Sequence, residues 1–398
     1  MSGPSRIIRV AARGEGVTED GRHIPFAAPG DLVAADGAVT PGPHHQMPPC
    51  RHFPACGGCD LQHLDDVAYA AFVRDRVAGA LAGQGLSAPV RDAILSPPAS
   101  RRRARLHAER RGGTALGFSE RGSHRLIDLA ECPVLAPELV ALLAPLRRLL
   151  GGMLSAKRRI EVELTLADQG IDLMLHGVTA DDLRTAEALS DFAAKHRLAR
   201  LSIDSGLGPE TRWEPEEASI TLGGVPVPLP HGAFLQPTRE GEAALVAAAR
   251  EALAGSEGVI ADLFAGLGTF ALSLGGRAYA AEAGRDAALA LMAAAGRAQR
   301  PIFAEHRDLY RRPLQPDELN RFGAVLLDPP RAGARDQMLT LAQSRVPVIV
   351  YISCNPSSFA RDVKILCEVG YALDWVQPVG QFRWSTHVEL AARLVRTA

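Results

Sequence analysis

Cys354 is the side chain in this sequence best suited to nucleophilic chemistry. It stands in Ser353-Cys354-Asn355-Pro356, directly after the apolar run 348–352. A cysteine on a stiff loop at the carboxyl end of a central strand lies where open α/β sheets bind their ligands. A small buried residue, the usual state of a free cysteine, explains the position equally well. Position alone therefore leaves both interpretations open.

An acidic residue follows the preceding strand-like run. Asp328 begins Asp328-Pro329-Pro330-Arg331, after the apolar run 325–327. The paired prolines stiffen the loop and remove two N–H groups. Adenine N6 methyltransferases carry an acidic or Asn residue, Pro-Pro and then an aromatic ring, and Arg331 in place of the ring argues against stacking of an amino-bearing base. Taken alone, Asp328 is equally well explained as a strand-end cap.

A glycine-containing loop, DLFAGLGT at 262–269, precedes these segments. Gly266 and Gly268 allow a tight turn and a close approach of backbone to ligand. A dinucleotide site would have a third glycine where this chain has Ala271. The carboxylate of Asp262 suits a cationic ligand better than a pyrophosphate. S-adenosylmethionine has a sulfonium, an amino group and no phosphate, so it fits these features.

Two more acidic residues end the next strand-like runs. Glu282 ends the second run, where a carboxylate can accept hydrogen bonds from both ribose hydroxyls. Asp308 lies just past the third run, where the edge of adenine would come. A structural glycine turn with a solvated glutamate remains the alternative.

A bound sulfonium would give Cys354 a specific task. Uracil C5 is a poor nucleophile, but thiolate attack at C6 produces an enolate whose C5 can take a methyl group. A base must then remove the C5 proton before the cysteine leaves. Glu389, in Thr386-His387-Val388-Glu389, is a candidate for this base. Outside this context it would be a surface glutamate.

Four cysteines have a spacing typical of a metal site. Cys50, Cys56 and Cys59 lie within ten residues, and Cys132 can supply a fourth thiolate. Zinc sites usually have two C-x2-C pairs, and only Cys56 and Cys59 form one, so the spacing favours iron–sulfur over zinc. Six cysteines in 398 residues are too few for a disulfide scaffold, and a reducing cytoplasm is the expected compartment.

Arginines are concentrated in the stretch between Cys59 and Cys132. Such a patch suits phosphate contact and stacking of guanidinium groups on unpaired bases, with a solvated charged face as the alternative. The predicted RNA-binding residues are Arg101, Arg102, Arg103, Arg105, Arg110 and Arg111. The whole chain has 44 Lys and Arg against 45 Asp and Glu, a net charge of -1, which excludes a globally basic nucleic-acid coat protein.

Strand-like and helix-like runs alternate from residue 231 onward. This alternation predicts a parallel sheet covered by helices on both faces, the Rossmann-like α/β arrangement. The expected strands are 259–264, 278–282, 301–305, 324–328 and 347–353. We expect three parts: a short β region with a proline-rich linker at 1–49, an α+β domain at 50–230, and the α/β domain at 231–398. We expect no signal peptide and no membrane span, because no apolar run approaches roughly 18 residues.

Several of these motifs occur together, in one order. They are the cysteine spacing, DLFAGLGTF, DPPR, ISCNPSSFARD and THVE. In this combination the chain resembles the S-adenosylmethionine-dependent RNA uracil-C5 methyltransferases, and their iron–sulfur members in particular, over nearly its whole length. The resemblance implies a class I methyltransferase domain, a [4Fe–4S] cluster held by the four cysteines, and an N-terminal TRAM-like, OB-type β region whose second half is missing.

The resemblance also implies roles for individual residues. Cys354 would be the nucleophile and Glu389 the base, with Asp328, Phe234 and Arg331 in the pocket of the target base. The implied cofactor contacts are Gln236, Asp262, Phe264, Gly266, Gly268, Thr269, Glu282, Asp308 and Asp328. Thr269 stands where some relatives have Asn, and Pro237 where many have Val.

The resemblance points to an RNA substrate whose target base is flipped into the pocket. Iron–sulfur members mostly act on large-subunit ribosomal RNA, so 23S rRNA is the first expected substrate and tRNA the second. A non-catalytic RNA-binding protein of the same fold and a zinc-bearing DNA methyltransferase are the competing classes. DNA cytosine-C5 enzymes have Pro before their cysteine, whereas Ser353 precedes Cys354 here. We expect a cytoplasmic monomer.

Overall fold

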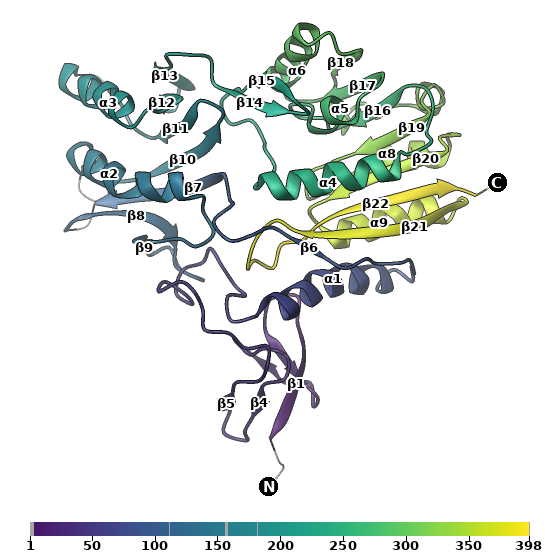
Figure 1. Ribbon diagram of the computed structural model, residues 1–398, viewed down its shortest axis with the longest axis horizontal. Helices are drawn as coiled ribbons and strands as arrows, with labels where there is room; N and C mark the ends of the chain where they lie inside the picture. The colour runs from purple at the N-terminus through teal and green to yellow at the C-terminus, as the bar shows by residue number, and fades with distance from the viewer. Residues whose placement is uncertain (1–3, 111, 156–157, 181, 398) are drawn as a thin grey trace.

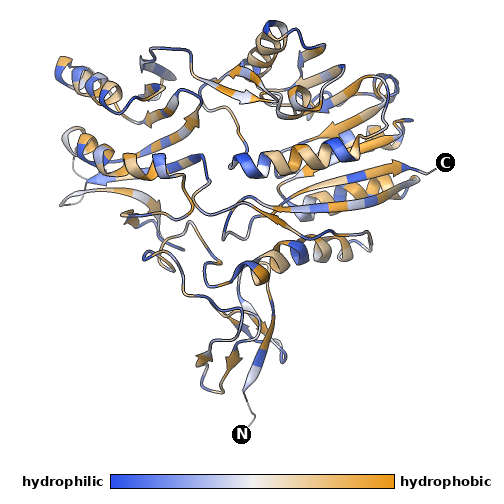
Figure 2. Ribbon diagram, viewed as in Figure 1, coloured by the Kyte–Doolittle hydropathy of each residue, from blue (hydrophilic) through white to orange (hydrophobic). Residues whose placement is uncertain are grey.

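The computed structural model describes residues 4–110, 112–155, 158–180 and 182–397. Figure 1 shows a small sheet near the N-terminus, a second sheet formed by the middle of the chain, and a large sheet formed mainly by its C-terminal half. Figure 2 shows hydrophobic residues along the strands of the large sheet and on the helices beside it. No helix in the described ranges is long and apolar enough to cross a membrane.

The N-terminal sheet has five short antiparallel strands in the order β3-β2-β1-β4-β5. They are β1 (Ser5–Val10), β2 (Gly16–Thr18), β3 (His23–Ile24), β4 (Leu32–Val33) and β5 (Val39–Thr40). Ile7, Ala27 and Val33 form its small core. Within the described ranges β3 and β5 are its free edges, so it is an open sheet. Its assignment as a truncated TRAM region stays a prediction.

The proline-rich segment after β5, which we expected to be a linker, is tied to this sheet. The buried carboxylate of Asp31 accepts hydrogen bonds from the N–H of Ala28 (2.8 Å) and of Gly42 (2.7 Å). Asp31 also lies 2.8 Å from Nδ1 of His45. Because the buried carboxylate of Asp31 binds both Gly42 and His45, the first part of this segment is fixed to the N-terminal sheet.

The middle of the chain forms a seven-stranded sheet in the order β13-β12-β11-β10-β7-β8-β9. The strands are β7 (Arg103–Arg110), β8 (Thr114–Ser119), β9 (Leu126–Asp128), β10 (Arg159–Ala167), β11 (Gly170–His176), β12 (Arg200–Asp204) and β13 (Pro209–Trp213). Helices α2 (Pro137–Met153) and α3 (Leu183–Lys195) share its apolar core. Side chains alternate along a strand. In β7, Ala104, Leu106 and Ala108 therefore enter this core, while Arg103 and Arg105 face away from it.

The large sheet has the order β18-β17-β16-β19-β20-β22-β21-β6. Its parallel strands are β16 (Ile260–Leu263), β17 (Ala278–Glu282), β18 (Ile302–His306), β19 (Ala324–Leu327) and β20 (Val348–Ser353). β21 (Tyr371–Gly380) and β22 (Glu389–Arg396) complete it as an antiparallel pair. The five strands expected from the sequence are therefore present and parallel, each within two residues of its predicted bounds.

Helices cover both faces of the large sheet. One face carries α1 (Asp66–Ala82), α8 (Arg335–Ala342) and α9 (Pro356–Cys367). The other carries α4 (Arg239–Ala252), α5 (Thr269–Leu274) and α6 (Arg285–Arg297). The short α7 (Pro316–Leu319) lies at the edge of the first layer through Leu319.

The expected domain boundaries differ from the observed packing. Helix α1 and strand β6 (Ile94–Leu95) fall inside the predicted 50–230 domain, yet β6 pairs with β21, and Tyr69 and Phe72 of α1 share the core of the large sheet. The hairpin of β14 (Ser219–Leu222) and β15 (Val225–Pro228) packs on α6. An apolar helix face in a sequence does not reveal which sheet it will cover, so these segments were assigned to the wrong unit.

Candidate active site and cysteine site

A cavity of ≈ 680 Å³ lies at the carboxyl ends of the parallel strands, where open α/β sheets bind ligands. Both predicted catalytic residues, Cys354 and Glu389, line it. The other predicted site residues on its wall are Phe234, Phe264, Gly266, Thr269, Glu282, Asp328 and Arg331. The cavity therefore joins the glycine loop, DPPR, SCNP and THVE segments, which lie as far apart as residues 266 and 389.

Cys354 lies between β20 and α9, on a loop fixed by its neighbour. The Asn355 side chain caps α9 by accepting a hydrogen bond from Ser357 N (3.1 Å), and its Nδ2 donates to Arg331 O (3.0 Å). Asn355 therefore joins the SCNP loop to the DPPR loop. Burial, together with the charges of Glu389 and Asp328, raises the pKa of the Cys354 thiol to about 11. The thiol is thus protonated at neutral pH and must lose its proton to react.

Glu389 and Asp328 are two acids on the wall of one cavity. Glu389 is the first residue of β22 and is 3% exposed. Burial and the nearby Asp328 raise the pKa of Glu389, and burial raises that of Asp328. Because a buried carboxylate is costly without a positive partner, this pair favours a cationic ligand in the cavity.

Two buried glutamines connect these acids. Gln236 Nε2 donates to Asp328 Oδ2 at 3.3 Å. Gln381 Nε2 donates to Gln236 Oε1 at 2.8 Å and to Glu389 Oε2 at 2.9 Å. Gln236 therefore acts behind the cavity wall, and the sequence analysis missed Gln381. Gln381 could have been noticed in the sequence, because it directly follows a strand and lies eight residues before Glu389.

Glu282 binds the backbone on two sides of the cavity. Its Oε2 accepts a hydrogen bond from Gly266 N (2.8 Å), and its Oε1 accepts one from Gly284 N (2.6 Å). Gly268 is the N-cap residue of α5 with φ +89°, and a Cβ atom there would lie 2.4 Å from Leu291 Cδ1. Glycine is therefore required at 268 for packing, although this residue does not line the cavity.

Asp262 and Asp308 are placed differently from the expectation. Asp262 is completely buried beneath the glycine loop, where its Oδ2 accepts a hydrogen bond from Ala271 N at 2.8 Å. Burial raises its pKa to about 8. Asp308 Oδ1 accepts from Tyr310 N at 3.0 Å, which places Tyr310 on the cavity wall 5.5 Å from the ring of Phe264. Neither acid lines the cavity, so both shape its loops from behind.

The four predicted metal-binding cysteines line one small cavity, with Phe53, Phe118 and Arg101 among its other walls. Around zinc, with Zn–S bonds of about 2.3 Å, tetrahedral thiolates would lie about 3.8 Å apart. Among the described residues, the groups of three metal-binding side chains with donor atoms within 4.8 Å of one another include no cysteine. Among the described residues the four thiols therefore surround one cavity without the close mutual spacing of the ligands of a single zinc ion.

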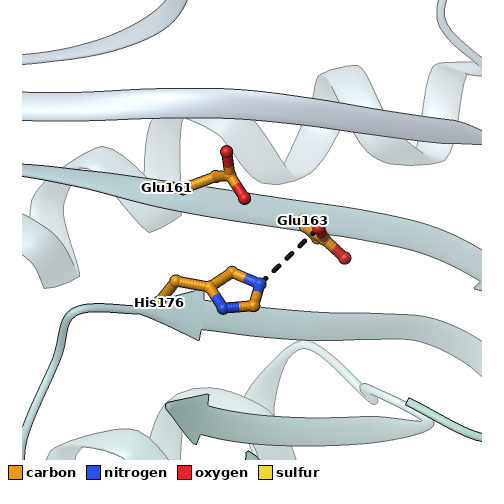
Figure 3. Close-up of side chains that lie close together, drawn as sticks. All are labelled: Glu161, Glu163 and His176. Atoms are coloured by element: carbon orange, nitrogen blue, oxygen red, sulfur yellow. Dashed lines mark ion pairs between the residues drawn. The ribbon is translucent and has the colours of Figure 1, made fainter. Parts of the chain in front are cut away.

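A second group of potential ligands lies on the polar face of the middle sheet. Figure 3 shows Glu161 and Glu163 of β10 beside His176 of β11. Arg105 pairs with Glu161 at 3.4 Å and also with Glu163, and His176 lies 3.6 Å from Glu163. Because Arg105 already balances these carboxylates, the group is an ion-pair network on the protein surface.

Arg102 does not fit the predicted RNA-binding patch. Its side chain is 3% exposed, pairs with Glu242, and donates through Nε to Gln236 O at 2.9 Å. A guanidinium in this position holds the chain around Gln236 and cannot reach a phosphate. Arg102 is therefore a structural residue, and its assignment to the patch was wrong.

The other predicted arginines have different environments. Arg103 donates to Leu235 O at 3.1 Å and stacks over the ring of Phe234 at 5.4 Å. Arg101 lines both the cysteine cavity and a groove that reaches Phe234. Arg105, with a 63% exposed side chain, also lines this groove, whereas the exposed Arg110 donates to Leu154 O at 3.2 Å. Arg111 lies outside the described residues.

The chain matches known methyltransferases over most of its length. The family model described as tRNA (Uracil-5-)-methyltransferase matches residues 302–397. An RNA methyltransferase of Zymomonas mobilis is 52% identical over 97% of this chain and 98% of its own length. The 23S rRNA (uracil(1939)-C(5))-methyltransferase of Chromohalobacter salexigens is 33% identical over 90% of this chain and 78% of its own length.

A solved structure has the same fold. The tRNA (uracil-54, C5)-methyltransferase of Pyrococcus abyssi, in complex with S-adenosyl-L-homocysteine, superposes with a TM-score of 0.77 at 23% identity. The match covers 98% of this chain and all of that one. With relatives similar over nearly the whole chain, and with Cys354 and Glu389 in one cavity, this protein belongs to the RNA (uracil-C5)-methyltransferase family and is an enzyme of that class.

Proposed function

We propose that this enzyme forms 5-methyluridine in 23S rRNA, with S-adenosylmethionine as methyl donor, Cys354 as nucleophile and Glu389 as base. The observation that carries the proposal is one cavity lined by Cys354, Glu389, Asp328 and Glu282. A nucleophile, a base and a ribose-binding carboxylate are the groups that this reaction needs. The 33% identical relative, named for a 23S rRNA uracil, supports the choice of substrate.

S-adenosylmethionine, when bound, supplies the methyl group. The carboxylate of Glu282 suits the ribose of S-adenosylmethionine, and Phe264 and Thr269 form the adjacent part of the cavity wall. The buried acids Asp328 and Glu389 favour its positive charge.

Cys354 and Glu389 carry out the other steps, which are addition to uracil C6 and removal of the C5 proton. The Cys354 thiol gives its proton to Asp328 or to water, which leaves Glu389 free to accept the C5 proton, and Sγ adds to uracil C6. Addition raises the electron density at C5, where the methyl group is received. Glu389 then accepts the C5 proton, the C5–C6 double bond re-forms, and the C6–S bond breaks to release Cys354.

A [4Fe–4S] cluster on Cys50, Cys56, Cys59 and Cys132 is part of the proposal. The separation of the sulfur atoms supports a group larger than one zinc ion. Anaerobic purification with iron, sulfide and zinc determination tests this assignment. About four irons and four sulfides per chain are expected, and one zinc in their place would contradict it. The cytoplasmic location and the monomeric state stay predictions.

Trapping with RNA that contains 5-fluorouridine tests the chemistry. Fluorine replaces the C5 proton that the base must remove, so the covalent adduct with Cys354 should persist. Cys354→Ala should give no adduct and reduce methylation at least about a thousandfold. An adduct that survives Cys354→Ala would contradict the role of this cysteine.

The substrate is tested in cells that lack the protein. Mass spectrometry of nuclease digests should show loss of one 5-methyluridine from 23S rRNA. Loss from tRNA alone would keep the chemistry and replace the substrate. Loss from neither RNA would contradict the catalytic role of Cys354.

A further inference from the structure

Gln381 connects the proposed base to the opposite wall of the cavity. It directly follows β21 and is 1% exposed. Its amide nitrogen has two N–H groups, and both have acceptors: Glu389 Oε2 at 2.9 Å and Gln236 Oε1 at 2.8 Å. Gln381 itself does not line the cavity, and it reaches the cavity wall through its hydrogen bond to Glu389.

The direction of these hydrogen bonds is fixed by their partners. With Glu389 ionised, turning the Gln381 amide over would place its oxygen against the oxygens of Glu389 and Gln236, and both contacts would be repulsive. Gln236 is oriented in the same way, because its Nε2 donates to Asp328. Two amides therefore join two carboxyl groups, and each carboxyl group receives one N–H.

We propose that Gln381 is a positioning residue: it binds Oε2 of Glu389, leaves Oε1 for the substrate, and favours the ionised, proton-accepting form of Glu389 during the reaction. The inference rests on the proposed function of Glu389. Burial and Asp328 both favour the neutral acid, whereas an N–H donated to a carboxylate favours the ionised form. Among the described residues, Gln381 is the side chain that donates to Glu389.

Helix α4 fixes Gln381 from behind. A Cβ atom at Gly241 would lie 2.5 Å from both Cβ and Oε1 of Gln381. Glycine at this position therefore lets the glutamine lie flat against the helix. Gly241 does not line the cavity, so Gly241→Ala acts on the cavity wall through the displacement of Gln381.

Gln381→Leu tests the proposal, with Gln377→Leu as matched control. Gln377 is also buried on β21, and its amide also donates two hydrogen bonds, but to the backbone carbonyls of Asp92 and Pro378. The pH profile of kcat and the amount of covalent RNA adduct are measured for both variants and for wild type, with ordinary uridine RNA and S-adenosylmethionine.

In Gln381→Leu, the acidic limb of the pH profile of kcat should move to higher pH by about one unit, because Glu389 loses a hydrogen bond that favours its charged form. Activity should recover at higher pH, and the adduct should accumulate because removal of the C5 proton is slow. Gln377→Leu should show neither change. Gly241→Ala should shift the limb in the same direction by a smaller amount.

A purely structural role for Gln381 gives a different result. Equal loss of kcat at every pH without adduct, or behaviour identical to Gln377→Leu, would overturn the inference while leaving Glu389 as base. Wild-type enzyme that forms no 5-methyluridine on any tested RNA would instead overturn the proposed function, and this inference with it.

Discussion

The N–H of Leu61 donates a hydrogen bond of 2.9 Å to the carbonyl oxygen of Trp384, and the N–H of Asp60 donates to the same oxygen at 2.8 Å. Asp60 and Leu61 directly follow Cys59. Trp384 has φ +56° and lies in the loop between β21 and β22, which begins at Gln381 and leads into Glu389. The cysteine site therefore touches the loop that carries the proposed base.

Cys59→Ser should loosen this loop. Loss of the proposed cluster would remove the support behind Asp60 and Leu61, so amide hydrogen exchange in 381–388 should become faster. Exchange mass spectrometry measures this change directly, together with a fall in kcat. Cys367→Ser, in α9 and outside the cysteine site, is the control. Unchanged exchange in 381–388 despite loss of the bound group would show that the two sites are independent.

The buried acids make the free enzyme less stable as pH rises. Glu389 has a folded-state pKa raised from 4.5 to about 8, so between these values the folded chain holds a proton that the unfolded chain has lost. The free energy of unfolding therefore decreases with rising pH through this window. Glu389→Gln should flatten the dependence and raise Tm at pH 8 by about 5 °C while abolishing turnover.

Thermal unfolding from pH 5 to 8 checks this prediction. Glu240→Gln, an exposed change on α4, serves as the control and should leave the slope as in wild type. A Glu389→Gln slope identical to wild type would mean that Glu389 is ionised in the free enzyme.

Glu282 should determine the affinity for S-adenosylmethionine. Glu282→Gln places an amide NH2 where one carboxylate oxygen accepted an N–H from Gly266 or Gly284, so one side of the cavity must shift. We expect Kd, measured by calorimetry, to rise about tenfold to a hundredfold. Glu305→Gln is the control: this residue binds the Tyr279 hydroxyl on the neighbouring strand and does not line the cavity. Equal effects of both changes would argue against a direct role for Glu282.

The sequence predicted the features that depend on local pattern. Strands such as 278–282 could be predicted because a strand buried on both faces of a parallel sheet is mostly apolar. The topology of such a sheet brings the ends of these strands together, and with them Cys354, Asp328 and Glu282. Features that depend on tertiary partners were missed. Arg102 resembles its neighbours in the sequence, but only Arg102 meets Glu242 in the interior. Gln381 acquires its role from Gln236, 145 residues away in the chain.

The contrast between Arg102 and Arg105 gives the last prediction. Arg102→Met leaves the partly buried Glu242 without its partner, so the free energy of unfolding should fall by about 1–3 kcal/mol. Arg105→Met removes an exposed side chain that lines the groove near Phe234, so stability should change by less than about 0.5 kcal/mol. Arg105→Met should bind RNA more weakly, and the slope of log K for RNA binding against log[salt] should become shallower by about one.

Urea unfolding and salt-dependent RNA binding separate the two roles. The double change Arg102→Met with Glu242→Met should recover part of the lost stability, because no unpaired buried charge remains. If Arg102→Met instead keeps wild-type stability and loses RNA affinity, its guanidinium reaches RNA after all and the original patch stands. If Arg105→Met binds RNA with the wild-type salt dependence, the groove near Phe234 does not hold a phosphate through Arg105, and its pairing with Glu161 and Glu163 is its whole role.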